Sequence, residues 1–321
     1  MDVSLSVARR HRLDRQRLED AAFRGTTRLF ALGVLVLLGG VVAALAAGAV
    51  PALAKFGAGF LASEAWNPVK ERFGALPAIY GTLVTSAIAM VIGIPLALGI
   101  AVFLTELCPP ALRRPIGTLI ELLAAIPSII YGIWGLFVLA PFLQLTVQPF
   151  LIGTLGNLPI VGALFAGPPL GLGVLTAGVI LGFMVLPFIA SVARDVFLTV
   201  PAMLRESAYG VGATTSEVVR RIVLPYTRAG VIGGIMLGLG RALGETMAVT
   251  FVIGNAHRIK ASLLAPGTTI SATLANEFTE AVGDLYTSSL FALGFILFII
   301  TFIVLAAAKL MLLRLEQRAA K

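Results

Sequence analysis

The sequence has few charged residues and almost none of the side chains that build disulfide or metal sites. Only 12% of its 321 residues are Asp, Glu, Lys or Arg, whereas soluble domains carry about 25%. Cys108 is the single cysteine, so the chain has no disulfide framework. The two histidines, His11 and His257, lie far apart along the sequence. We therefore expect no metal site built on histidine and cysteine.

Motifs of nucleotide binding and of enzyme catalysis are also missing. No G-x4-G-K-[ST] run is present, so the chain has no sequence signature for holding ATP phosphates. No cluster of residues reads as a nucleophile with its base, or as a set of metal ligands. The sequence therefore predicts neither an enzyme nor a cofactor bound by this chain, and any ATP and Mg²⁺ would belong to a partner.

Long apolar runs dominate what is present. Apolar residues make up 58% of the chain and the mean hydropathy is +0.99. About 20 apolar residues are needed to cross a bilayer. Six runs are long enough: Leu29–Val50, Ile79–Leu104, Ile116–Leu145, Leu170–Val192, Ala229–Ile253 and Ser289–Leu313. We therefore expect an all-α integral membrane protein with six transmembrane helices. The first run is long enough for a retained anchor, with a cleaved signal peptide as the alternative.

The distribution of Lys and Arg predicts the orientation. Most of these residues fall in segments 1–28, 105–115, 194–228 and 309–321, and cytoplasmic loops carry such an excess. Both termini are therefore expected in the cytoplasm, with a cytoplasmic segment 1–28, a transmembrane domain 29–313 and a cytoplasmic tail 314–321. The net charge of +8 then reflects topology, and we expect no nucleic-acid partner. A seventh span within 146–169 would place the C-terminus outside, so we expect a re-entrant or amphipathic segment there.

A polar loop, residues 201–225, separates the fourth and fifth runs. Met203 to Val211 is helix-compatible, and Gly212 is suited to the left-handed conformation that follows a helix end. Thr214 and Glu217 have the spacing of a capping box that starts a second helix. We expect Pro225 to end that second helix. The sequence therefore predicts two short helices around a glycine, and a solvated helix–turn–helix without a partner is the plain alternative.

The same loop carries seven residues at a diagnostic spacing. The pattern E-[AS]-A-x3-G-x9-I-x-L-P is matched by Glu206, Ser207, Ala208, Gly212, Ile222, Leu224 and Pro225. It resembles the cytoplasmic coupling loop of permease subunits in ATP-binding-cassette (ABC) importers. The resemblance implies the type I, MetI-like permease fold and assigns these seven residues to coupling with an ATPase.

Two charged residues, Arg241 and Glu245, fall inside the fifth run. A charged side chain at the bilayer centre costs about 2.5–3.5 kcal/mol on insertion scales. Four residues apart in a helix, they would share one face, where an ion pair that stabilises packing is one explanation. The other is a substrate pathway, since arginine presents paired donors to phosphate oxygens and Glu245 would accept a proton from protonated phosphate.

A second resemblance covers roughly residues 60–310. The run RALGETMAVTFVIGN at 241–255, with Trp66-Asn67-Pro68, Phe73-Gly74, Pro77 and Gly81-Thr82, resembles the PstC-type permease family of bacterial phosphate importers. Ser207 stands where the general importer pattern often has alanine, which is a change between small residues.

This second resemblance implies a phosphate permease of the bacterial inner membrane. The family forms half of a translocation pathway, paired with a related second permease, two ATPase subunits and an external phosphate-binding protein. Arg241 and Glu245 would lie in the substrate pathway. Permeation of another oxyanion or small solute is the closest alternative, and an ATP-independent channel or carrier is another, although no internal repeat typical of carriers is visible.

Overall fold

The protein is described by a computed structural model that covers residues 2–159 and 161–319, with side chains described over 19–159 and 161–314. Its internal contacts divide the chain into two units, residues 1–48 and 49–321. Among the described residues, six helical segments are long and apolar enough to cross a membrane: Glu19–Phe56, Leu76–Leu107, Ser128–Leu155, Val174–Leu198, Thr215–Leu243 and Asp284–Arg314. The prediction of an all-α protein with six spans is confirmed.

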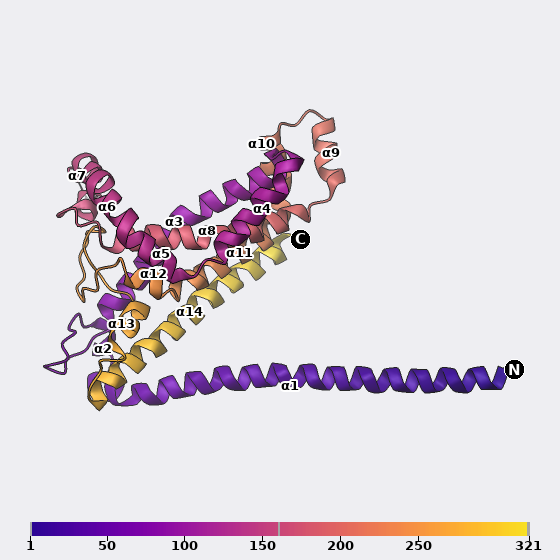
Figure 1. The fold of residues 1–321 in the computed structure, drawn as a ribbon, viewed down its shortest axis with the longest axis horizontal. Coiled ribbons are helices and arrows are strands. Elements are labelled where there is room, and N and C mark those ends of the chain that lie inside the picture. The colour runs from indigo at the N-terminus through magenta and orange to yellow at the C-terminus, as the bar shows by residue number, and fades with distance from the viewer. Residues whose placement is uncertain (1, 160, 320–321) are drawn as a thin grey trace. The chain divides into compact units, whose positions relative to one another are not determined.

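In the part of the chain that the structure describes, the α-helices follow one another without an intervening sheet (Figure 1). They are α1 (Asp2–Phe56), α2 (Gly59–Ala62), α3 (Leu76–Val102), α4 (Pro110–Ala124), α5 (Ser128–Trp134), α6 (Ala140–Phe142), α7 (Gln148–Leu155), α8 (Val174–Leu198), α9 (Ala202–Gly210), α10 (Thr215–Val218), α11 (Leu224–Leu243), α12 (Met247–Thr250), α13 (Ile270–Glu277) and α14 (Asp284–Ala319). A 3-10 turn covers Val161–Phe165.

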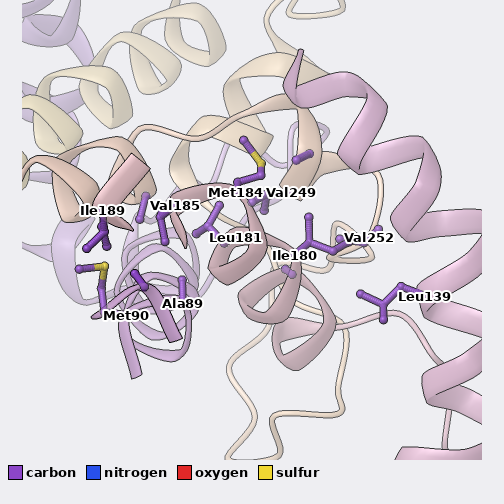
Figure 2. Close-up of a cluster of buried hydrophobic side chains, with 14 of the residues drawn as sticks. Ala89, Met90, Leu139, Ile180, Leu181, Met184, Val185, Ile189, Val249 and Val252 are labelled. Atoms are coloured by element: carbon purple, nitrogen blue, oxygen red, sulfur yellow. The ribbon is translucent and has the colours of Figure 1, made fainter. Parts of the chain in front are cut away.

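The centre of the second unit is the packing of α8 against α3 on one side and α11 on another (Figure 1). Ala89 and Met90 of α3 lie beside Val185 and Ile189 of α8 (Figure 2). Val249 joins this buried cluster from the segment after α11. Because α8 has apolar or small residues around most of its circumference, it is the most enclosed of the six spans.

The register of α11 against α8 is set by glycine. A methyl group added at any of three glycines of α11 would come within 2.8 Å of a branched side chain of α8: Gly230 against Val196, Gly234 against Val192 and Gly238 against Ile189. These contacts step one turn at a time along antiparallel helices, as small residues permit in membranes. Arg241, one turn beyond Gly238, therefore lies level with the middle of α8.

Among the described residues, four π-helical segments lie within or at the end of long helices, and each ends two residues before a proline. They are Phe103–Leu107 before Pro109, Gly135–Leu139 before Pro141, Leu143–Val147 before Pro149, and Val219–Val223 before Pro225. A proline ring clashes with the carbonyl four residues earlier in an α-helix, and that carbonyl lies in the widened turn in each case. The expectation that Pro225 ends a helix is therefore wrong, because the helix continues through it to Leu243.

The third span begins later than predicted. The expected run Ile116–Leu145 is divided between α4 and a separate spanning helix, Ser128–Leu155. The break falls at Ile126-Pro127, because the residue before a proline disfavours helical geometry. The spanning helix also takes in the first part of segment 146–169, which the sequence suggested was re-entrant or amphipathic.

The outer half of the fifth span is not one helix. After α11 ends at Leu243, the chain forms α12 and then α13, whose first four residues are buried. Thr82 Oγ1 of α3 accepts a hydrogen bond from the backbone nitrogen of Ile270 at 3.0 Å. Gly81 allows the carbonyl of Thr268 to lie directly against α3. The segment 254–288, which lies between the fifth and sixth apolar runs of the sequence, therefore includes a helix packed into the bundle.

Candidate functional site

The first helix, the glycine turn and the capping box of the 201–225 loop form as the sequence predicts, whereas the second helix continues into the fifth span. The first helix, α9, ends at Gly210, and Gly212 has a φ of +88° in the left-handed region. Thr214 and Glu217 form both bonds of the capping box, with Thr214 N donating to Glu217 Oε2 at 3.0 Å. The turn between α9 and α10 is therefore specified locally by a glycine and a cap.

The surface of this loop is unusually apolar for a solvated connection. Met203, Tyr209 and Val211 are exposed, with 87% of Val211 accessible. A groove of about 400 Å³ lies between the two helices, lined by Ala208, Val211, Gly212, Ala213, Glu217, Val218, Arg221 and Ile222. Exposed apolar patches with a polar rim mark protein interaction sites, so this end of the molecule is suited to a protein partner.

The seven pattern residues divide into two groups in the structure. Glu206, Ser207 and Gly212 are exposed, so they are available to a partner. Ile222 and Leu224 are partly buried and pack on the cluster that contains Phe197 and Val218. The pattern therefore combines contact residues with residues that fix the loop to the bundle. Ala208 also packs on this cluster, and Pro225 is exposed.

An ion pair that the sequence did not indicate joins α9 to the end of the second span. Arg205 Nη2 lies 3.0 Å from Glu106 Oε1, and only 5% of the Glu106 side chain is exposed. The same nitrogen donates to the carbonyl oxygen of Phe197 at 2.7 Å. Since no sequence pattern relates positions 106 and 205, this contact could be found only from the fold.

Arg241 and Glu245 do not form the same-face pair expected from the sequence. The helix ends at Leu243 with Gly244 after it, so Glu245 lies outside α11. The Glu245 Oε1 atom accepts a hydrogen bond from the Ala248 nitrogen at 3.3 Å. Within the part of the chain whose side chains are described, neither residue forms an ion pair. Glycine disfavours helix continuation, and Glu245 then holds the turn into α12.

Arg241 is exposed at this break and close enough to Tyr131 of α5 to interact electrostatically with its hydroxyl group. Next to it, Gly132 lets α5 approach Ala248 of α12 closely. Irregular backbone at membrane depth is tolerated only against protein or beside a water-filled cavity. Arg241 has no ion-pair partner among the described residues and lies level with the middle of α8. Its side chain therefore has to face water or a partner subunit.

A second polar cluster, which we call the outer cluster, consists of Trp66, His257, Glu277 and Tyr286. Glu277 Oε2 accepts bonds from Trp66 Nε1 and Tyr286 Oη, both at 2.7 Å. His257 Nε2 lies 2.7 Å from Glu277 Oε1, and its ring stacks on Trp66. Burial alone raises the pKa of Glu277, but the bonds from His257, Tyr286 and Trp66 outweigh it and lower that pKa. The cluster joins three segments that are distant in sequence.

Family comparison matches residues 93–319 to the binding-protein-dependent transport system inner membrane component. Proteins named phosphate transport system permease protein PstC are similar over most of the chain. The Mesorhizobium japonicum protein is 67% identical over 94% of this chain and 92% of its own length. The Pasteurella multocida protein is 56% identical over 92% of each chain. A probable one from Methanocaldococcus jannaschii is 38% identical over 80% of this chain and 82% of its own.

Solved structures support the fold. A chain of the inward-facing MetNI methionine ABC transporter matches with a TM-score of 0.55 and 18% identity, covering 74% of this chain and 94% of that one. A chain of a bacterial ABC transporter that imports alginate matches with a TM-score of 0.52 and 16% identity, over 74% of this chain and 79% of that one. The MetI-like permease fold expected from the sequence is confirmed.

Proposed function

The chain belongs to the family of binding-protein-dependent transport system inner membrane components, and we propose that it is the permease through which an ABC importer carries inorganic phosphate. Membership makes it a multi-pass membrane protein and a transport subunit, with ATP hydrolysis on separate subunits. The observation that supports phosphate is the position of Arg241. It is a cation at a helix break, level with the middle of the bundle, in a chain similar over nine-tenths of its length to phosphate permeases.

The family implies association with ATPase and substrate-binding partners. We further propose a heterodimer with a related permease, two ATPase subunits that bind ATP and Mg²⁺, and an external phosphate-binding protein. The exposed face around Arg241 and Tyr131 would then be covered by the second permease. This arrangement would satisfy the irregular backbone after Leu243 and enclose a path between the two subunits.

In this proposal the 201–225 loop receives the movement of the ATPases through its exposed residues, Glu206, Ser207 and Gly212 among them. The ion pair between Arg205 and Glu106 then carries that movement from α9 to the end of the second span. Because α3 packs along α8, a shift of α9 would reach the helices that position Arg241. The guanidinium would offer two parallel donors to phosphate oxygens, while Glu245 would shape the turn beside it.

Measurement of substrate uptake tests this proposal. Cells that depend on this chain for phosphate import should accumulate labelled phosphate, and excess unlabelled sulfate should not compete. Competition by sulfate equal to that by phosphate would favour the alternative of a general oxyanion permease. Uptake that continues without the ATPase subunits would instead favour a channel or carrier.

We also propose that both termini and the 201–225 loop face the cytoplasm, from the excess of Lys and Arg in those segments. A reporter enzyme that is active only in the cytoplasm, fused after Lys321, should be active. A reporter active only outside the membrane, fused at the same position, should be inactive, and the reverse result would overturn the orientation.

A further inference from the structure

A pocket lined mainly by charged and hydroxyl-bearing residues lies between α4 and α8. Figure 1 shows α4 at the same end of the bundle as α9 and α10. The pocket has a volume of about 410 Å³ and is lined by Leu104, Thr105, Arg113, Arg114, Thr118, Glu121, Arg194 and Leu198. None of these residues belongs to the seven-residue pattern or to the surroundings of Arg241. The transport function proposed above therefore leaves this pocket without a role.

Its three arginines are in different electrostatic states. Arg194 is neutralised, because its Nη2 atom lies 2.7 Å from Glu121 Oε1 and 2.9 Å from Asp195 Oδ1. Gly117 leaves room for this guanidinium against α4. Arg194 therefore lines the pocket with its charge already paired to two carboxylates.

Arg113 and Arg114 have no such neutralisation. Arg113 Nη2 donates to the neutral carbonyl oxygen of Thr105 at 3.0 Å. The Arg113 Nε atom is buried with no hydrogen-bond partner, and leaving a buried donor unsatisfied is unfavourable. Among the residues whose side chains are described, neither arginine has a carboxylate within ion-pair distance. The pocket therefore presents two guanidinium groups that have no carboxylate partner among the described residues.

Part of the exposed surface of α4 is apolar. Four leucines along this helix are exposed: Leu112, Leu119, Leu122 and Leu123. A short helix with a charged start and an apolar face lies at the boundary between headgroups and hydrocarbon. A lipid headgroup held by the arginines at the start of α4 would therefore have the exposed leucines of the same helix within reach of its acyl chains.

We propose that this pocket binds the phosphate headgroup of an anionic phospholipid such as phosphatidylglycerol. The phosphodiester accepts hydrogen bonds from the guanidinium groups of Arg113 and Arg114, and the acyl chains lie along the leucines of α4. Free inorganic phosphate has the same oxyanion chemistry, but it would make no use of the apolar surface. The leaflet follows from the orientation proposed above, whereas the site itself does not depend on it.

Lipid retention tests the site directly. The chain would be purified, with the subunits that accompany it, into nanodiscs of phosphatidylcholine doped with phosphatidylglycerol, and bound lipid would be counted by native mass spectrometry. The double variant R113Q/R114Q is compared with K309Q/R314Q. The control also removes two positive charges, but from the C-terminal part of α14. Basic residues near anionic lipid each contribute about fivefold in affinity. Because two such contributions multiply, the pocket variant should retain roughly 25-fold less phosphatidylglycerol, and the control should match the unmodified chain.

Three results would overturn the proposal. They are equal retention by the two double variants, equal retention of phosphatidylcholine and phosphatidylglycerol, or release of the lipid by millimolar inorganic phosphate. The last would make the pocket a free phosphate site. R114Q alone, at an exposed position, gives the same comparison if the double variant does not fold. Since lipid is counted without measuring transport, failure here leaves the proposed function standing.

Discussion

Arg205 of α9 is bound to Glu106 at the end of the second span, with 3.0 Å between Nη2 and Oε1. The arginine stands next to Glu206, the first residue of the coupling pattern. The exposed contact surface of the 201–225 loop is therefore one residue away from a largely buried connection to the helix bundle. This connection gives the loop a definite route to α3.

Removing one partner of this ion pair should damage both stability and coupling. Loss of one charge from a buried pair costs about 3–5 kcal/mol. Glu106→Ala should therefore lower the melting temperature of the purified complex and the amount of solute transported per ATP hydrolysed. Lys55→Ala is the matched control, because it breaks the exposed Lys55–Glu71 pair, which is worth only about 0–1 kcal/mol. Equal effects of the two variants would show that the buried pair has no special role.

Substitution of Arg241 should abolish phosphate uptake without preventing assembly. Arg241→Gln removes the guanidinium at an exposed position, so folding should be little changed. Labelled phosphate uptake and co-purification of the subunits measure the two effects. Arg314→Gln serves as the control for loss of one cation, and uptake by Arg241→Gln equal to that of this control would contradict the pathway assignment.

Glu245 offers a separate test, because its structural role differs from that of Arg241. In Glu245→Gln the remaining amide oxygen still accepts from Ala248 N, so α12 should keep its position. If the carboxylate takes part in the pathway, uptake should fall several-fold with unchanged melting temperature. Unchanged uptake would limit Glu245 to holding the turn.

The left-handed backbone at Gly212 should make this position sensitive to the type of side chain. A Cβ there meets no neighbour within 4 Å, so the cost of substitution comes from φ alone, about 1–2 kcal/mol for most residues. Gly212→Val should uncouple ATPase activity from transport, whereas Gly212→Asn, which tolerates this conformation, should retain most coupling. Gly210→Ala is the matched control, since its backbone is helical and uncrowded. Normal coupling in Gly212→Val would contradict the role of the turn.

Gly81 and Gly99 of α3 should respond in opposite ways to alanine. A Cβ at Gly81 would lie 1.8 Å from the carbonyl oxygen of Thr268, whereas a Cβ at Gly99 has nothing within 4 Å. Gly81→Ala should therefore displace the segment before α13 and lower the melting temperature sharply. Gly99→Ala should be neutral or stabilising by up to about 1 kcal/mol through helix propensity. Thermal unfolding of the two variants measures both effects. Equal melting temperatures would show that Gly81 is not required for the close packing of the Thr268 carbonyl against α3.

The outer cluster should make stability depend on acid pH. Burial raises the pKa of Glu277, but the hydrogen bonds from His257, Tyr286 and Trp66 outweigh this effect, so the pKa is lowered in the folded protein. Its contribution is therefore complete above the unfolded carboxyl's pKa, about 4.3, and is lost as pH falls through the lower folded value. Glu277→Gln should lower the melting temperature near neutral pH and reduce its fall on acidification. An unchanged acid profile in this variant would assign the pH dependence to other carboxyls.

Sequence reasoning predicted the fold class and the local geometry of the 201–225 loop. Hydropathy identifies spans because each must be apolar over its own length, and the cap at Thr214 and the turn at Gly212 depend on neighbouring residues alone. The resemblance of residues 241–255 to the phosphate permease family also depends on neighbouring residues alone, so it needed no coordinates. The roles of Arg241 and Glu245 remain predictions.

The errors occurred where the backbone responds to packing. Hydropathy could not distinguish the apolar surface helix α4 from a span, so the third span was placed too early. The helix continues through Pro225 because the turn before it is a widened π-turn. The expectation that proline ends a helix does not take such a turn into account. The pairing of Arg205 with Glu106 required the bundle to bring two distant positions together.

The widened turn at Val219–Val223 has one further consequence for the 201–225 loop. A π-turn closes its hydrogen bond one residue further along than an α-turn, and one residue corresponds to about 100° around a helix axis. Deleting a single residue from this turn would therefore rotate α10 and α9 by about a quarter of a circle relative to α11. The direction in which this protein presents its partner-facing residues is thus set by a one-residue phase shift beside Pro225.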